Sequence, residues 1–319
     1  MNRNLIIWPI LLLLCGMLYS QGEDQFLPSD QKQLTVVTEP ATLYKGFFKT
    51  SINYNYTSIK TIYNNEAQKE IISGASAARS SSFNFIAHYG ITDRIEVNLW
   101  VPYMMNKNNQ VFILDDPTAT ESYYMGSVKG FGLGDISMGI RAQVLKEQDR
   151  LPSVTLGSYL ELPTGRKNPS NETGFLEFDE ATGSGEFSLG IDAQVRKIAY
   201  PYSIAFTSGF EYKSGGQKIH FPGEVQTAFQ SGHVYYAIAG IDFHLNDWIC
   251  VTNDFNYTHI GKYSLDNSLV GDITWAFSWT PNIHFQVKKL RLAQGFIFPI
   301  AGRNFGGDPG FILIVQYIF

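Results

Sequence analysis

Residues 184–195 read SGEFSLGIDAQV and alternate in polarity. From position 187 every second residue is apolar (Phe, Leu, Ile, Ala and Val), whereas the positions between them include Asp192 and Gln194, with Glu186 just before and Arg196 just after. Because successive side chains of a β-strand point to opposite faces, this pattern predicts a strand with one apolar and one polar face. The two faces of such a strand meet different environments.

The same alternation recurs along the chain and predicts an all-β protein. Each segment has about ten residues or a few more, which is the length that a tilted strand needs to cross a bilayer. The expected strands, twelve in all, cover residues 46–57, 81–91, 94–105, 134–146, 152–163, 184–197, 202–213, 233–245, 248–260, 271–287, 290–300 and 310–319.

The connections between these strands distinguish a membrane barrel from a secreted sandwich. Short connections such as 92–93 and 288–289 alternate with long ones such as 106–133, 164–183 and 214–232. Both ends of the barrel segment fall on the side of the short turns. Outer-membrane barrels have short periplasmic turns and long extracellular loops, so we expect a single antiparallel up-and-down transmembrane β-barrel of about 12 strands.

Charge is also sorted between the two faces of the expected strands. No Asp, Glu, Lys or Arg occupies the apolar parity in the strand centres, and an Arg or Lys facing lipid at the bilayer midplane would cost about 2–4 kcal/mol. The opposite parity is therefore predicted to line a narrow lumen with charges of both signs. The predicted lumen-lining residues are Lys49, Arg94, Glu96, Asp135, Arg141, Glu161, Glu186, Asp192, Arg196, Glu211, Asp242, Asp254 and Arg291.

The N-terminus has the pattern of an export signal. Arg3 precedes the apolar run 5–14 (LIIWPILLLL), which is too short for a transmembrane helix, and 1–20 is expected to be a cleaved signal peptide. A lipoprotein signal at Cys15 is the alternative. Residues 21–45 are expected to form either a periplasmic lead or a plug of the lumen, and 46–319 the barrel.

Composition excludes several classes of protein. Cleavage would leave Cys250 as the only cysteine, so no intramolecular disulfide is expected. The formal net charge of −5 argues against a nucleic-acid partner. The histidines show no metal-ligand spacing, so neither a metal nor a cofactor is expected. Asp242 and His244 share the lumen face of one strand, which favours a polar contact over a catalytic dyad.

The segment 310–319, GFILIVQYIF, predicts the strand that closes the barrel. On its outer face it resembles the C-terminal signal that outer-membrane proteins present to the barrel-assembly machinery, which is therefore an expected partner along with outer-membrane lipid. Ile312, Ile314 and Ile318 fall on the opposite, inner face, where a water-filled pore would favour polar groups. The residues of the predicted assembly signal are Phe311, Leu313, Val315, Tyr317 and Phe319.

Three stretches resemble a known family. GLGDISMGIRAQV (132–144), LPTGRKN (162–168) and GSGEFSLGIDAQVRK (183–197) are similar, in order and spacing, to the outer-membrane barrel family named for the meta-pathway of phenol degradation. The resemblance extends over about residues 95–319 and implies an even-stranded outer-membrane transporter. It also implies uptake of aromatic or other hydrophobic compounds.

Together these patterns predict an integral protein of the bacterial outer membrane that passes small, hydrophobic or aromatic molecules through a narrow charged lumen. We expect no enzymatic activity. Two alternatives are also compatible with the sequence: a structural or adhesion barrel without transport, and an outer-membrane hydrolase.

Overall fold

The computed structural model describes most of the expected barrel. The predicted signal peptide and the first part of the predicted lead, residues 21–40, lie outside the described residues. The described residues are 41–71, 78–114, 122–148, 151–169, 180–219, 225–266 and 268–319. Side chains are described for all of these residues except 108–114 and 122–127.

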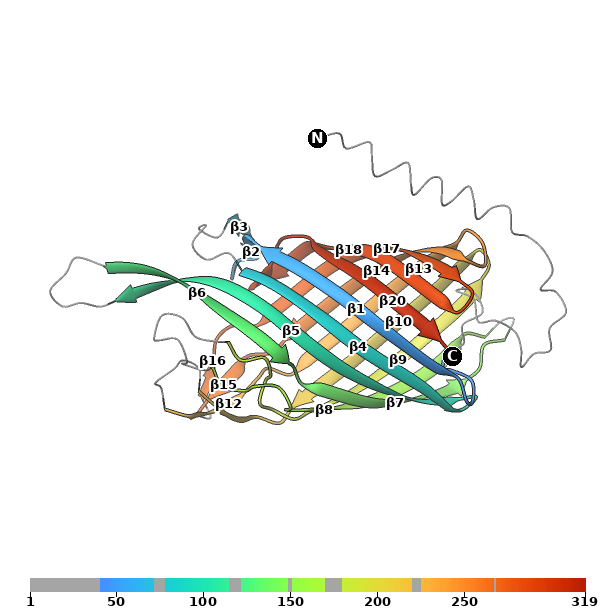
Figure 1. Cartoon of the computed structure of the whole chain (residues 1–319), viewed down its shortest axis with the longest axis horizontal. Helices are drawn as coiled ribbons and strands as arrows, with labels where there is room; N and C mark the ends of the chain where they lie inside the picture. The colour runs from blue at the N-terminus through green and yellow to red at the C-terminus, as the bar shows by residue number, and fades with distance from the viewer. Residues whose placement is uncertain are drawn as a thin grey trace, which may run out of the picture. The chain divides into compact units, whose positions relative to one another are not determined.

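Twelve antiparallel strands form a closed barrel (Figure 1). Each strand pairs with its neighbours in chain order, so the topology is up-and-down. The strands are β1 (Phe48–Ile59), β4 (Ala78–Thr92), β5 (Ile95–Leu114), β7 (Ile136–Leu145), β8 (Ser153–Leu162), β9 (Ser188–Ala199), β10 (Tyr202–Lys213), β13 (Val234–His244), β14 (Ile249–Ile260), β17 (Thr274–Val287), β18 (Leu290–Arg303) and β20 (Gly310–Ile318).

The first and last strands close the barrel. β1 pairs with β20 from Lys49, opposite Ile318, to Thr57, opposite Gly310. Phe319 continues the seam, because its amide donates to the carbonyl of Phe48 at 2.8 Å. A closed barrel leaves no strand edge free to pair with another chain. All twelve predicted strands are present, with bounds that differ by a few residues at most except at the far end of β5.

One prediction about the loops was wrong. Residues 106–133 were expected to be a loop, but β5 continues to Leu114 and pairs with β6 (Ser122–Leu133). The resulting hairpin extends beyond the barrel (Figure 1). The segment 106–110, NKNNQ, is polar at every position. A strand outside the membrane band needs no apolar face, so alternation in polarity does not reveal it.

The long connections carry short strands of their own. One sheet joins β19 (Phe305–Gly306), β2 (Thr61–Tyr63) and β3 (Lys69–Ile71). A second joins β11 (Gly216–Lys218), β12 (Thr227–Gln230), β15 (Tyr263–Leu265) and β16 (Ser268–Val270). No helix of the described residues is long and apolar enough to span a membrane.

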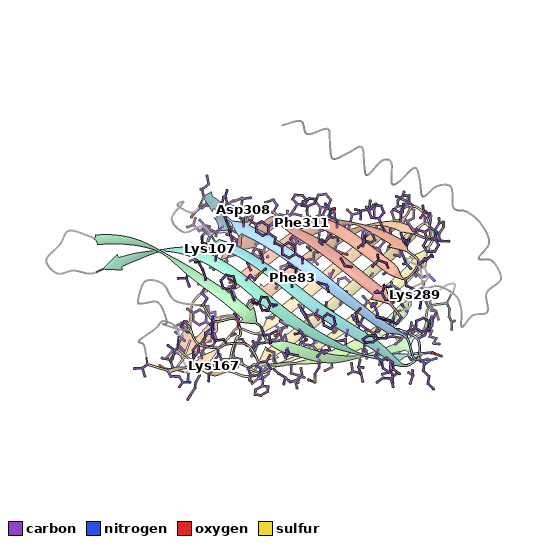
Figure 2. All side chains as sticks on the ribbon, in the orientation of Figure 1. Phe83, Lys107, Lys167, Lys289, Asp308 and Phe311 are labelled. Atoms are coloured by element: carbon purple, nitrogen blue, oxygen red, sulfur yellow. The ribbon has the colours of Figure 1, made fainter. Side chains whose placement is uncertain are left out.

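The outer face of the barrel is apolar. Leu189 and Ile191 are 51% and 56% exposed, and this pattern repeats on one parity of the strands around the wall. Figure 2 labels two residues of this outer face, Phe83 and Phe311, with Lys289 at the end of the short turns. A wall that exposes its largest apolar side chains requires a lipid surrounding, because water would favour their burial.

Candidate functional site

The inner face of the barrel carries most of the predicted lumen-lining residues. Since the apolar side chains point outward, the alternate positions of each strand point inward. Ten of the thirteen predicted residues occupy such positions in the strands. They are Lys49, Glu96, Arg141, Glu161, Asp192, Arg196, Glu211, Asp242, Asp254 and Arg291.

Charged side chains from β8, β9 and β10 form one cluster on this face. The hydroxyl of Tyr159 donates to Glu211 at 3.0 Å, and Lys213 forms ion pairs with Glu211 and with Glu161, the latter at 3.3 Å. Lys213 also donates to the hydroxyl of Ser188 at 2.9 Å. These contacts link three neighbouring strands toward the end of the long loops.

A second cluster lies toward the end of the short turns, which in outer-membrane barrels faces the periplasm. Arg141 donates to the side-chain oxygen of Gln194 at 2.9 Å and lies 3.7 Å from the carboxylate of Glu96. His88 contacts the same carboxylate at 3.3 Å. Glu96 is only 3% exposed, so its charge is stabilised by these partners.

The segment before β1 reaches this second cluster. We call residues 41–47 the mouth segment. The backbone amide of Leu43 donates to Glu96 at 2.8 Å, and Thr42 and Leu43 are each 1% exposed. Leu43 packs against Ile318 of the closing strand. The mouth segment therefore begins inside the wall at the short-turn end.

Backbone contacts hold the same segment against β4. The amide of Gly46 donates to the carbonyl of Gly90 at 2.8 Å, and the amide of Gly90 donates to Phe47 at 3.0 Å. A Cβ at position 90 would lie 2.0 Å from the carbonyl oxygen of Tyr44. Only glycine permits this approach, so the sequence of β4 is adapted to the mouth segment.

Two inward tyrosines lie over glycines of the neighbouring strands. A Cβ at Gly190 would meet the ring of Tyr159 at 2.1 Å, and one at Gly209 would meet the ring of Tyr236 at 2.3 Å. Each ring thus occupies the space where a side chain of the adjacent strand would stand. This arrangement keeps large polar residues close to the wall.

Another part of the inner wall is aliphatic. The inner face of β20 carries Ile312, Ile314 and Ile318, with Gln316 between them. On β18 the position opposite Ile314 is Ala293. Ile312, Ile314 and Ala293 therefore form an aliphatic patch on β18 and β20, bordered toward the short-turn end by Arg291 and Gln316. The two ion-paired clusters lie over β5 to β10, which we call the charged side.

Three predicted residues lie outside the strands. Arg94 is exposed in the turn between β4 and β5 and is not part of the inner wall. Glu186 precedes β9 and accepts hydrogen bonds from the amide of Ser231, at 2.8 Å, and from its hydroxyl. The prediction extended the strand parity past the strand ends, where side chains hold turns and loops instead.

Asp135 ties together the three stretches that carry the family resemblance. Its carboxylate accepts hydrogen bonds from the amide of Gly165 at 2.9 Å, and from the amide and hydroxyl of Ser184 at 2.5 and 2.7 Å. A Cβ at Gly183 would lie 2.5 Å from the same carboxylate. The motifs thus form one loop anchor at the long-loop end, which explains their small residues.

Asp242 and His244 meet a third polar residue, Ser203. The hydroxyl of Ser203 donates to Asp242 at 2.6 Å, and His244 Nε2 lies 3.2 Å from the same hydroxyl. In a hydrolytic triad the carboxylate holds the imidazole. Here it holds the serine, and His244 Nδ1 is buried without a hydrogen-bond partner. No group of three or more potential metal ligands occurs among the described residues.

Sequence reasoning missed several residues of these clusters. Lys213 follows the inward parity of β10 and extending the charge count to the strand end would have found it. His88, Gln194 and Tyr159 are not formally charged, so a search restricted to charge passes over them. Trp100 was also missed, because an aromatic residue on the inward parity resembles ordinary wall bulk.

Comparison with known proteins identifies solved structures with a similar fold. No family model and no curated protein sequence matches the chain. Among solved structures, an outer membrane channel from Pseudomonas putida F1 superposes with a TM-score of 0.69 at 14% identity, covering 92% of this chain and 100% of that chain. The chain has the fold of an outer-membrane channel. The predicted barrel and its location as an integral protein of the bacterial outer membrane are thereby confirmed.

Weaker likeness extends to two further solved structures. The Ralstonia pickettii toluene transporter TbuX gives a TM-score of 0.45 at 9% identity, covering 87% of this chain and 90% of that chain. The CymD monoaromatic hydrocarbon channel gives a TM-score of 0.45 at 10% identity, covering 86% of this chain and 88% of that chain.

Proposed function

We propose that this protein is an outer-membrane channel for small molecules of hydrophobic or aromatic character. The observation that carries the proposal is that the inner wall has an aliphatic patch on β18 and β20 as well as ion-paired clusters over β5 to β10. Water and polar groups of a solute would follow the charged side, while an apolar body would slide along Ile312 and Ile314. A barrel of twelve strands lies between the filled eight-stranded barrels and the wide pores of sixteen or more.

The charged side suits a selective pathway rather than an open pore. Arg141 contacts a carboxylate of the neighbouring strand β5, and Lys213 contacts Glu211 on its own strand and Glu161 on β8, so these two positive charges are neutralised within the wall. Fixed ion pairs narrow the lumen and disfavour free passage of simple ions. The proposed solute is accordingly uncharged or weakly polar.

The mouth segment is proposed to narrow the periplasmic end, its first residues, 41–45, being the end of a proposed plug formed by residues 21–45. Its support is the burial of Thr42 and Leu43 and the hydrogen bond from Leu43 to Glu96. Because Leu43 itself makes the contact, a truncation must begin at Phe48 to remove it. We expect protein that begins at Phe48 to conduct several-fold more than protein that begins at Gln21, measured in planar bilayers. Equal conductance would show that the segment does not restrict passage.

Solute flux tests the proposal. Refolded protein in liposomes should admit phenol faster than a sugar such as arabinose, as measured by release of an entrapped reporter or by stopped-flow light scattering. Liposomes without protein control for direct permeation of phenol through the lipid. Flux that is independent of the protein for every solute would reject the channel and favour a structural or adhesion barrel.

The hydrolase alternative is tested separately. The Ser203, Asp242 and His244 cluster is the group of this wall that most resembles a catalytic site, and its hydrogen bonds are those of a structural contact. Ser203→Ala should leave the solute flux unchanged and no lipid or peptide hydrolysis should depend on it. Hydrolysis lost in this variant would support the enzyme instead.

A further inference from the structure

Trp100 is unusual among the inward side chains. It lies in β5 between Leu99 and Val101, whose side chains point outward, so the side chain of Trp100 points inward. Its side chain is 46% exposed. Apart from Thr92, which lies beyond the β-bulge at the end of β4, every other inward position of the twelve strands whose side chain the structure describes is less than about a third exposed. Trp100 therefore presents the most open surface of these residues to the lumen.

A hydrogen bond fixes the indole in this position. Nε1 of Trp100 donates to the side-chain oxygen of Asn84 on β4 at 3.1 Å. Asn84 in turn donates to the hydroxyl of Ser82 at 3.2 Å and is only 5% exposed. The polar edge of the ring is therefore satisfied within the wall, and the open part of the indole is its hydrocarbon surface.

The neighbours of Trp100 give this surface a mixed border. Ile86 lies directly opposite it on β4, and Ser137, which is 8% exposed, lies opposite it on β7. An aliphatic neighbour on one side and a hydroxyl on the other fit a ring that carries one polar substituent. Without a bound solute, the exposed hydrocarbon face of the indole is in contact with water, which is unfavourable for apolar surface.

We propose that Trp100 is a stacking platform that binds an uncharged aromatic ring during passage through the lumen. This inference rests on the proposed channel function and names the class of solute more narrowly. Stacking of two aromatic rings contributes about 0.5–1.5 kcal/mol beyond the burial of their surface, which delays a solute without trapping it. The platform makes the wall selective for planar rings over aliphatic molecules of the same size.

Block of single-channel current measures the platform directly. Phenol is the probe, and cyclohexanol is the matched solute of similar size and polarity without an aromatic face. In the wild type phenol should interrupt the current at lower concentration than cyclohexanol. Trp100→Ala should raise the half-blocking concentration of phenol about tenfold, since tenfold corresponds to about 1.4 kcal/mol. Trp100→Phe should raise it less than about threefold, because a ring face remains.

The control is Trp279→Ala, which removes an outward tryptophan. Phenol block in this variant should equal that of the wild type, and cyclohexanol block should be equal in all four proteins. If Trp100→Ala conducts and phenol blocks it as in the wild type, the platform is rejected while the channel stands. Block by choline that is stronger than block by phenol would also reject it, because the face would then select cations.

Fluorescence keeps the test independent of conduction. In protein that begins at Gln21, replacement of Trp248, Trp275 and Trp279 by phenylalanine leaves Trp100 as the only tryptophan. Nitrobenzene should quench its emission saturably at concentrations where nitromethane does not. If the wild type fails to conduct, the proposed function fails, and saturable quenching would still support the platform. Linear quenching by both compounds would overturn it.

Discussion

Individual side chains of the inner wall act through fixed partners. Glu96 illustrates this, because its carboxylate accepts a hydrogen bond from the backbone amide of Leu43 and also contacts the side chains of His88 and Arg141. A buried charge with several partners is costly to disturb, since removal of one charge leaves the others unpaired. The residue therefore couples the mouth segment to the charged side of the lumen.

Glu96→Gln should loosen the mouth segment. The neutral amide keeps the size of the side chain but weakens its hydrogen bond to Leu43 and its attraction to Arg141. We expect a cysteine at position 42, in a Cys250→Ser background, to react with a hydrophilic maleimide several-fold faster when Glu96 is replaced. Glu161→Gln is the control, because Glu161 makes no contact with the mouth segment among the contacts described here. Equal labelling rates in the three proteins would contradict the coupling.

Gly190→Ala should destabilise the barrel through the ring of Tyr159. The added Cβ would lie 2.1 Å from the ring, and overpacking of this kind costs about 1–3 kcal/mol. The temperature at which the folded, heat-modifiable form is lost should fall. Gly261→Ala is the control, since its nearest neighbour is 3.7 Å away. The double variant with Tyr159→Ala should recover most of the loss, and no recovery would reject the contact as the cause.

At the scale of elements, the strands could be predicted and the loop contacts could not. Lipid on one face and a polar lumen on the other impose alternation, as in 184–195, so position along the strand determines orientation. Asp135 and Glu186 stand just beyond strand ends, where no such rule applies and long-range partners decide. Trp100 lacked a signal for a different reason: it lies within β5, and strand parity shows where a side chain points but not whether other side chains cover it.

Phe319 should matter for closing the barrel. Its amide bonds to Phe48 at 2.8 Å, and the two rings lie 5.4 Å apart. Phe319→Ala should lower the amount of folded, heat-modifiable protein in the outer membrane, both by weakening the seam and by altering the proposed assembly signal. Leu189→Ala, which removes an outward side chain away from the seam, should have a smaller effect. A larger loss with Leu189→Ala would contradict the importance of the seam.

Asp308 should anchor the start of the long connection between β1 and β4, at Lys60 and Thr61, in a pH-dependent way. Burial alone would raise its pKa, but hydrogen bonds from the amides of Lys60 and Thr61, at 2.5 and 2.6 Å, hold the pKa below its ordinary value of 3.8. The anchor is therefore fully present above about pH 3.8 and is lost as the pH falls through the lower folded-state value.

Hydrogen exchange at Lys60 and Thr61 measures this anchor. At pH 7 both amides should exchange faster in Asp308→Asn than in the wild type, after correction for intrinsic rates. The difference should shrink below pH 3.8 as the wild-type carboxyl becomes protonated. A difference that is independent of pH would mean that shape rather than charge holds the loop.

At the scale of the whole molecule, the closed barrel explains how the chain can contact lipid on one face and the lumen on the other. Closure by β1 and β20 removes the strand edges, the outer parity meets lipid, and the inner parity encloses a lumen with ion-paired clusters and an aliphatic patch. The mouth segment lies at one end of this lumen and the Asp135 anchor at the other. This arrangement supports the proposed channel, in which the mouth segment is proposed to narrow the periplasmic end.

Single-channel recording of refolded protein in a planar bilayer tests this most directly. Protein that begins at Gln21 should give small discrete current steps, and protein that begins at Phe48 should give steps that are several-fold larger. Steps of both sizes would support a lumen that conducts and a segment that restricts it. The channel would be contradicted if neither protein gave current steps and neither supported solute flux into liposomes, although a heat-modifiability assay showed that both barrels were folded.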